Sequence, residues 1–278
     1  MKTIHKDNRY YTQFSSSTDL YQQLIKPALG KRHTDSQSEN NSDWYGTKTF
    51  NEAIKLFRGG DDKSYQMVKK LKAQGDRYLQ DEYHNFRQRL NDVQGYSPNV
   101  PSAILGLPKS MHNQKLLNRQ IIYRKIFFDR TANGMVNKDI LSIKGAYALS
   151  YLDYLERIGK CRFELWAGTS SDSIKGSIIW GLKLKNYDEP LNIYQSAFNL
   201  VNPAFLRRLD FKLDENMDDW PDITDDGYGR SAEKSPEYIT DWLGKKTIVI
   251  SNQLNLSPES SVKDNFEEVK KAFNNIYK

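Results

Sequence analysis

The stretch RKIFFDRTANGMVNKDILSIKGAYALSYLDYLERIGKCRFELWAGT, residues 124–169, decides the fold that the sequence predicts. Its apolar run 126–128 is aromatic and β-branched, and it stops at Asp129 ahead of the turn-forming pair Asn133-Gly134. Apolar residues then recur at helical spacing up to Ile158, and a second alternating run follows. Strand, loop, helix and strand in this order indicate an α/β domain with Asp129 at the end of its first strand.

Composition excludes several classes of protein. The chain has 278 residues, which favours a core domain with a substantial extension. It lacks an apolar run of the roughly 20 residues that a bilayer requires, so we expect no membrane partner. One Cys and four scattered His residues offer almost no material for a zinc cluster or a disulfide framework. The net charge of +6 permits a phosphate-rich partner, although the excess is modest for this length.

The chain is expected to have three parts. Residues 1–43 are polar and predict a partly flexible segment, 44–118 a mainly helical region with a Pro-rich connector, and 119–278 the α/β domain. One long helix is predicted from 65 to 93. The connector, 95–111, holds more apolar residues than a solvated linker needs, so we expect it to pack on the core. These residues are Val100, Ile104, Leu105 and Leu107.

The rest of the α/β domain follows from similar patterns. A strand is predicted at 176–185, two helices between 191 and 213, a buried strand at 247–250 and a closing helix at 258–277. The acidic run 214–226 lacks the spacing of a calcium loop, and we expect an acidic surface loop there.

Asp129 and its neighbours form the candidate site. Ligands of open α/β sheets bind at the carboxyl ends of strands. The Asp129 carboxylate, the Thr131 hydroxyl and the Asn133 amide oxygen are ligands that suit Mg²⁺ or Mn²⁺. The alternative is that Asp129 caps the helix or orders the turn.

This loop resembles the first loop of von Willebrand factor A-like domains, where an Asp-x-Ser-x-Ser motif binds a metal after the first strand. The resemblance covers about 121–277 and puts Thr131 and Asn133 in the two Ser positions. The late Ser/Thr-Asp-Gly turn of that family corresponds here to Ser251-Asn252-Gln253. Asn252 removes a charge there, so the resemblance implies a metal site that is weakened or absent. It implies a Rossmann-like C-terminal sheet with flanking helices.

The whole chain also resembles a protein family encoded by tailed phages and bacterial mobile elements. The residues that carry this second resemblance are Trp44-Tyr45-Gly46-Thr47 with Phe50 and Ala53, Asn99-Val100-Pro101, Gly106-Leu107-Pro108 with Met111, Lys144-Gly145-Ala146, Leu155-Glu156 and Pro203-Ala204-Phe205-Leu206-Arg207-Arg208. The resemblance implies a phage origin, with action in the host cytoplasm or in the virion, and it supplies no reaction.

Two functions compete. The first is non-enzymatic binding of a phage or host protein through the strand-end loops, since neither a nucleophile elbow nor a phosphate-binding loop occurs in the sequence. The second is a nucleic-acid-binding accessory protein for phage replication, packaging or defence evasion, which acts through basic residues of the predicted long helix. These are Lys69, Lys70, Lys72, Arg87 and Arg89. Acidic residues interleave with them, however, and favour a solvated helix with local ion pairs.

Overall fold

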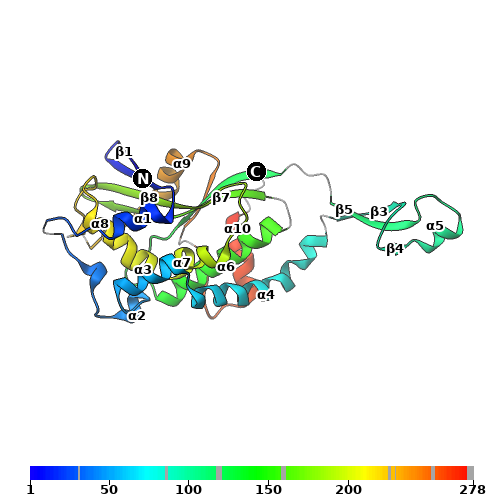
Figure 1. The fold of residues 1–278 in the computed structure, drawn as a ribbon, viewed down its shortest axis with the longest axis horizontal. Helices are drawn as coiled ribbons and strands as arrows, with labels where there is room; N and C mark the ends of the chain where they lie inside the picture. The colour runs from blue at the N-terminus through cyan, green and yellow to red at the C-terminus, as the bar shows by residue number, and fades with distance from the viewer. Residues whose placement is uncertain are drawn as a thin grey trace.

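A mixed sheet forms the centre of the computed structural model, which describes residues 1–30, 32–84, 87–116, 121–157, 161–224, 227–228, 230–251 and 254–273 (Figure 1). The strand order is β1-β2-β8-β7-β6-β10, and β9 pairs with β7. The strands are β1 (Lys2–Lys6), β2 (Arg9–Phe14), β6 (Ile122–Asp129), β7 (Cys161–Ser173), β8 (Gly176–Lys185), β9 (Arg230–Ser231) and β10 (Thr247–Ile250). β6 runs parallel to both β7 and β10, whereas β8 is antiparallel to β7. The predicted α/β class is confirmed.

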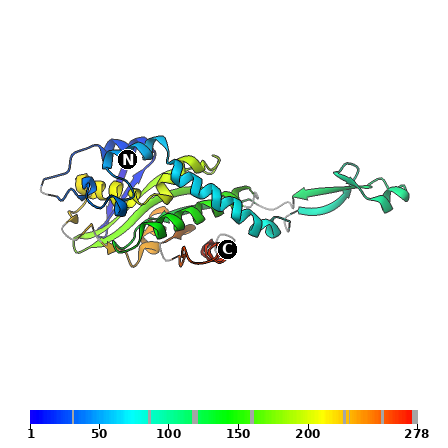
Figure 2. The ribbon, with the colours of Figure 1, turned by 90° about the horizontal axis from the view of Figure 1, so that it is seen from below.

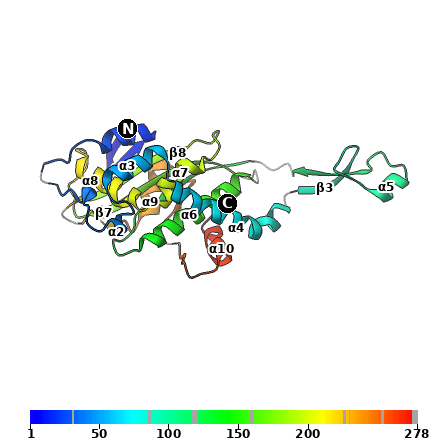
Figure 3. The same cartoon turned by 60° about the horizontal axis from the view of Figure 1, so that its bottom comes forward.

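Helices cover both faces of this sheet. One face packs on α1 (Ser17–Leu24), α3 (Phe50–Gly59), α4 (Asp62–His84), α6 (Lys138–Arg157), α7 (Ile193–Val201), the π-helix η2 (Phe205–Asp210), α8 (Phe211–Asn216) and α10 (Val262–Phe273) (Figure 3). The other face packs on α9 (Ser235–Leu243). The β6 residues Ile126 and Phe128 enter the first core and Phe127 the second, as the alternation of a strand requires. Among the described helices, none combines the length and the apolar character that a membrane crossing needs.

The N-terminal strands correct one expectation. The predicted flexible segment 1–43 contains β1 and β2, and β2 pairs in parallel with β8 of the α/β domain. The central sheet therefore draws strands from both sides of the expected boundary at 118–119. Of these two strands only Tyr11, Thr12 and Phe14, all in β2, are buried. β1 is the edge strand of the sheet, and its residues are exposed or half-buried.

A projecting arm is the second difference from expectation. The predicted helix 65–93 ends at His84, and β3 (Arg87–Asp92), β4 (Ser97–Pro98) and β5 (Met111–Leu116) form a separate sheet in the order β3-β5-β4. Short helix α5 (Val100–Ile104) lies at its end. Figures 1 and 2 show this arm extending away from the central sheet. The connector does not pack on the core as predicted, because its own strand pairing satisfies the backbone.

Gly145 allows the helices α6 and α7 to pack closely against each other. α6 and α7 pack together, and a Cβ atom at Gly145 would lie only 1.7 Å from the carbonyl oxygen of Leu200. The obstacle is backbone, so it cannot turn away as a flexible side chain could. Gly145 is therefore required for the spacing of α6 and α7.

We expect Gly145→Ala to lower the free energy of unfolding by at least about 2 kcal/mol. Alanine gains up to about 1 kcal/mol of helix propensity, but the clash with backbone exceeds that gain. Urea unfolding followed by circular dichroism measures the change. Gly59→Ala is the matched control, since no atom lies within 4 Å of its added Cβ. Equal stabilities of the two variants would contradict this account of the helix spacing.

Candidate functional site

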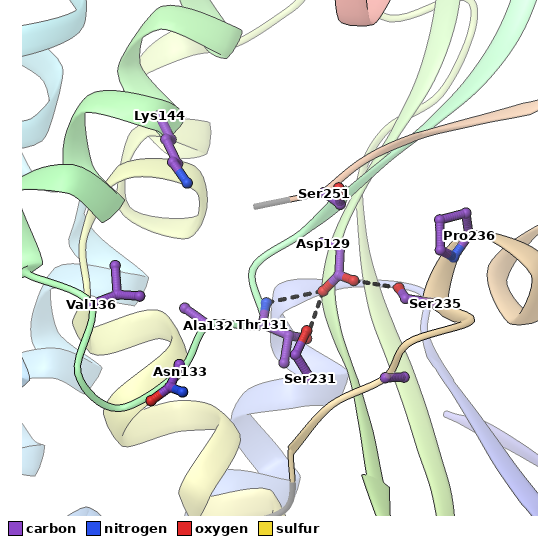
Figure 4. Close-up of a pocket in the computed structure, with 11 residues that line it drawn as sticks. Asp129, Thr131, Ala132, Asn133, Val136, Lys144, Ser231, Ser235, Pro236 and Ser251 are labelled. Carbon is purple, nitrogen blue, oxygen red and sulfur yellow. Dashed lines mark hydrogen bonds between the residues drawn. The ribbon is translucent and has the colours of Figure 1, made fainter. Parts of the chain in front are cut away.

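A small pocket lies at the carboxyl ends of β6 and β10, between the start of α9 and the N-terminal half of α6 (Figure 4). Its volume is about 220 Å³. The polar side chains that line it are Asp129, Thr131, Asn133, Lys144, Ser231, Ser235 and Ser251. Asp129, Thr131 and Asn133 lie at the end of β6, as the sequence predicts. Ligands of open α/β sheets bind at such strand ends.

Asp129 is buried at the end of β6 and is held by three hydrogen bonds. Its Oδ1 atom accepts from the Thr131 backbone N (2.9 Å) and from Thr131 Oγ1 (2.6 Å), and its Oδ2 atom accepts from Ser235 Oγ. Burial raises the pKa of the Asp129 carboxyl, and the donors on Ser235 and Thr131 partly oppose that rise. The carboxylate thereby ties α9 to β6 and orders the turn after β6, which agrees with the alternative interpretation from the sequence.

Two of the proposed metal ligands, Thr131 and Asn133, make hydrogen bonds within the protein. The Thr131 hydroxyl donates to Asp129 and accepts from the Ser170 backbone N at 2.7 Å. Asn133 is exposed, and its Oδ1 accepts from the Met135 backbone N at 3.1 Å. Asn252 lies outside the described residues. Within the described part of the chain, no group of three or more His, Cys, Asp or Glu side chains could hold a metal ion. The hydrogen bonds of Thr131 and Asn133 therefore disfavour a Mg²⁺ or Mn²⁺ site, because both oxygen atoms would have to leave their present partners to bind an ion.

Lys144 is one of the pocket residues that the sequence did not predict, together with Ser231 and Ser235. It lies on α6, is only 9% exposed, and burial lowers the pKa of its ammonium group. Figure 4 shows its side chain directed toward the pocket. The sequence does hold a signal, because Lys144 shares the apolar stripe of α6 with Ile140 and Tyr147. A lysine on an apolar stripe is either paired inside the protein or directed into a site.

Three buried arginines hold the loops around this pocket. Arg130, next to Asp129, donates to the carbonyl oxygens of Leu141 (3.3 Å), Leu200 and Asn202 (3.0 Å). Burial lowers the pKa of Arg130 to about 9. One guanidinium thus links the strand-end loop to the start of α6 and to the end of α7.

Arg207 and Arg208 on η2 make similar contacts with the N-terminal segment. Arg207 donates to the carbonyl oxygens of Trp44 (2.6 Å) and Val136, and its guanidinium lies 4.1 Å from the Trp44 ring centroid. Arg208 donates to Thr47 Oγ1 (3.0 Å) and lies over the ring of Tyr45. It also donates to the carbonyl oxygens of Ser36, Ser38, Thr47 and Lys48. Two of the stretches that carry the phage-family resemblance, residues 44–47 and 203–208, therefore contact each other directly.

The acidic run beyond η2 is partly buried, which corrects the predicted acidic surface loop at 214–226. Asp214 and Glu215 lie inside α8, where Glu215 accepts from the Ser36 backbone N (2.8 Å) and from Ser36 Oγ (2.6 Å). Asp210 accepts from Thr169 Oγ1 at 2.7 Å and from Trp180 Nε1. Burial raises the pKa of Asp210 to about 6. Asp218 and Asp219 are exposed, as predicted, while 225 and 226 lie outside the described residues.

The basic candidates belong to two different elements, α4 and β3. Lys69 and Lys70 are exposed on α4, but Lys72 pairs with Asp153 at 2.8 Å, within the ion pairs that link α4 to α6. Arg87 and Arg89 belong to β3 in the arm, and their side chains lie outside the described part of the structure. The partner of Lys72 is thus on α6 and is not one of the interleaved acidic residues of its own helix.

The fold and the pocket together define a class: an α/β protein with a mixed sheet, a polar strand-end pocket and an inserted β arm. The chain belongs to a family described as "Domain of unknown function (DUF7192)", whose model matches residues 2–276. The match includes β1 and β2, the arm and the closing helix, so the family covers the central sheet and the arm together. No curated protein and no solved structure matches the chain.

The raised pKa of Asp210 predicts a loss of stability with rising pH. Its unfolded value is about 3.9 and its folded value is about 6, so the folded state binds more protons between these values. Stability should fall by about 2–3 kcal/mol from this group as pH rises from about 4 to 6.5. Asp210→Asn should flatten the slope, measured by urea unfolding at each pH. The exposed control Asp218→Asn should keep it, and equal slopes in both variants would rule out Asp210 as the source.

The hydrogen bonds of Asp129 and Thr131 predict no stabilisation by divalent cations. A ligand that binds the native state raises the melting temperature. We expect Mg²⁺ or Mn²⁺ at millimolar concentration to leave the melting temperature of the wild type and of Asp129→Ala unchanged, measured by scanning fluorimetry. A rise in the wild type that is lost in Asp129→Ala would instead show a metal site that forms by rearrangement of the loop.

Proposed function

We propose that this protein is a protein-binding or assembly protein of a bacteriophage, and that its partner contacts the end of the arm. The observation that carries the proposal is the exposure of large apolar side chains there: Ile104 is 80% exposed and Leu105 is 74% exposed. Other large apolar side chains exposed on the arm are Val93, Tyr96, Val100 and Leu107. Apolar groups gathered on one exposed element typically mark a protein-protein contact.

The charge of the arm favours a partner with an acidic border. Between residues 87 and 116 the sequence has four Lys or Arg residues and one Asp. A protein surface with an apolar centre and an acidic rim would complement both features. The partner we propose is therefore a phage or host protein with that kind of surface. Nucleic acid would satisfy the cations but would leave the apolar residues of α5 in water.

We also propose that the central sheet belongs to a von Willebrand factor A-like domain. The order β8-β7-β6-β10, with β8 antiparallel and Asp129 at the end of β6, supports a von Willebrand factor A-like domain. The contacts between 44–47 and 203–208 involve two of the stretches of the phage-family resemblance, and this resemblance supports an origin in a phage. In this proposal the protein acts in the host cytoplasm or on the virion. In addition to the arm, the strand-end loops form a second contact surface in this proposal.

Site-specific photocrosslinking tests the arm. A photoreactive amino acid in place of Ile104 should crosslink to one protein from an extract of the bacterial host or of infected cells. Excess wild-type protein should suppress that product, whereas excess of the double variant Ile104→Ser and Leu105→Ser should not, because its apolar surface is reduced. The same photoreactive group in place of Ile174, which is 93% exposed on the central domain, is the matched control.

Three outcomes would contradict the proposal. Equal crosslinking from the positions of Ile104 and Ile174 would show contact without specificity. Suppression by the double variant would show that the apolar end is not the contact. A crosslinked product that nuclease treatment removes would assign the arm to nucleic acid instead.

A further inference from the structure

We propose that a second pocket, formed by α1, the start of α3 and α8, binds a small apolar molecule with one uncharged carbonyl oxygen. That oxygen accepts a hydrogen bond from the ammonium group of Lys212. We call this site the α1–α3 pocket. It is separate from the arm and from the pocket at the end of β6, and it does not depend on the proposed protein partner.

The α1–α3 pocket has a volume of about 520 Å³ and an apolar lining. It lies beside α1, which packs on α8 (Figure 1). Further lining residues come from the chain after α1, from the end of η1 (Asp35–Gln37), from the start of α3 and from α8. The apolar ones are Tyr21, Leu24, Ile25, Pro27, Phe50 and Ile54. The lining therefore suits the apolar body of a ligand.

Lys212 is the lining residue that lacks a hydrogen bond. Its side chain comes from α8 and is 2% exposed. The ammonium group has three N–H donors, yet within the described residues its Nζ atom has no hydrogen-bond acceptor. A buried donor without an acceptor is costly in free energy. Because the lysine stem is flexible, the ammonium group can turn toward an acceptor in the pocket.

The charge of Lys212 is already balanced within the protein. Its Nζ atom lies 3.7 Å from Glu215 Oε2, which is close enough for an ion pair but too far for a hydrogen bond. Glu215 in turn accepts hydrogen bonds from the backbone N and Oγ of Ser36 and from the Tyr228 hydroxyl. The carboxylate of Glu215 is therefore held in place by other donors.

This ion pair decides the charge of the ligand. A ligand carboxylate next to Lys212 would be repelled by the nearby carboxylate of Glu215, and a ligand cation would be repelled by Lys212 itself. An uncharged carbonyl oxygen supplies the acceptor that Lys212 lacks and leaves the ion pair intact. The ligand class that fits is thus an apolar amide or ketone.

The size of the pocket sets an upper limit on the ligand. A volume of about 520 Å³ corresponds to roughly seventeen waters at about 30 Å³ each. A molecule of that size or smaller fits, with its hydrocarbon part against residues such as Leu24 and Phe50. The exposed polar residues that also line the pocket lie where it meets water. They are Lys26, Gln37, Glu39 and Asn51.

Three probes with the same hydrocarbon chain test the proposal on the full chain: hexanamide, hexanoate and hexylamine. Calorimetric titration measures their binding, and scanning fluorimetry measures the melting temperature. We expect hexanamide to bind and to raise the melting temperature, because a ligand of the native state stabilises it. Hexanoate and hexylamine should bind at least tenfold more weakly, since each adds a charge beside the ion pair.

Variants of the pocket test which residues make the contact. Lys212→Met and Phe50→Ser should each weaken the binding of hexanamide at least tenfold, the first by loss of the donor and the second by loss of apolar surface. The matched control is Lys55→Met, because Lys55 is exposed on α3 and does not line the pocket. It should bind hexanamide like the wild type.

Circular dichroism and the melting temperature without ligand establish whether each variant folds. If Lys212→Met does not fold, Phe50→Ser and the comparison of amide, acid and amine still decide. Absence of hexanamide binding would overturn the proposal and leave water as the partner of Lys212. Hexanoate binding as tightly as hexanamide would overturn the uncharged class. Unchanged binding by Lys212→Met would overturn the hydrogen bond, because the apolar lining alone would then hold the probe.

Discussion

The donation of hydrogen bonds from buried guanidinium groups to backbone carbonyls is the interaction on which the rest of this structure depends. Arg208 alone binds carbonyl oxygens of residues 36, 38, 47 and 48, and Arg207 binds those of Trp44 and Val136. These segments have little regular secondary structure of their own, so their carbonyl groups need partners from elsewhere. The π-helix η2 brings two consecutive arginines to them, while Asp210 on the same helix binds Thr169 and Trp180 of the sheet.

Burial of these guanidinium groups is costly in free energy, and their hydrogen bonds and ring contacts offset that cost. Each guanidinium is planar with five donors, so it can satisfy several carbonyls that diverge in direction. Aromatic rings complete the surroundings, with Trp44 over Arg207 and Tyr45 over Arg208. Removal of such an arginine would leave several buried carbonyl groups without donors at once. The N-terminal segment, η2 and the strand-end loop therefore depend on one another for their order.

The sequence predicted the elements whose hydrophobic pattern is strong. β6, α6, β8 and β10 were found because their apolar residues follow strand or helix periodicity and lie in the core. β1 was missed because an edge strand is solvated and polar, and β2 was missed because only three of its six residues are buried. The buried carboxyl groups of α8 were missed for a related reason: composition identifies an acidic run, but the partners that permit burial, such as Ser36 for Glu215, are about 180 residues away.

The arm and the pocket also have features that the sequence alone does not predict. Apolar residues such as Ile104 predict a buried position. The sequence does not show whether the surface that covers such residues belongs to the same chain or to another protein. In the arm, local strand pairing satisfies the backbone without covering the apolar side chains, and this exposure is the basis of the proposed contact with another protein. In the pocket, the Asp-x-Thr-x-Asn loop directs attention to a metal, whereas the structure adds Lys144 from the following helix and Ser235 from α9. Spacing along one loop identifies only the part of a site that the loop carries, because the side chains that complete the pocket depend on how α6 and α9 pack around the end of β6.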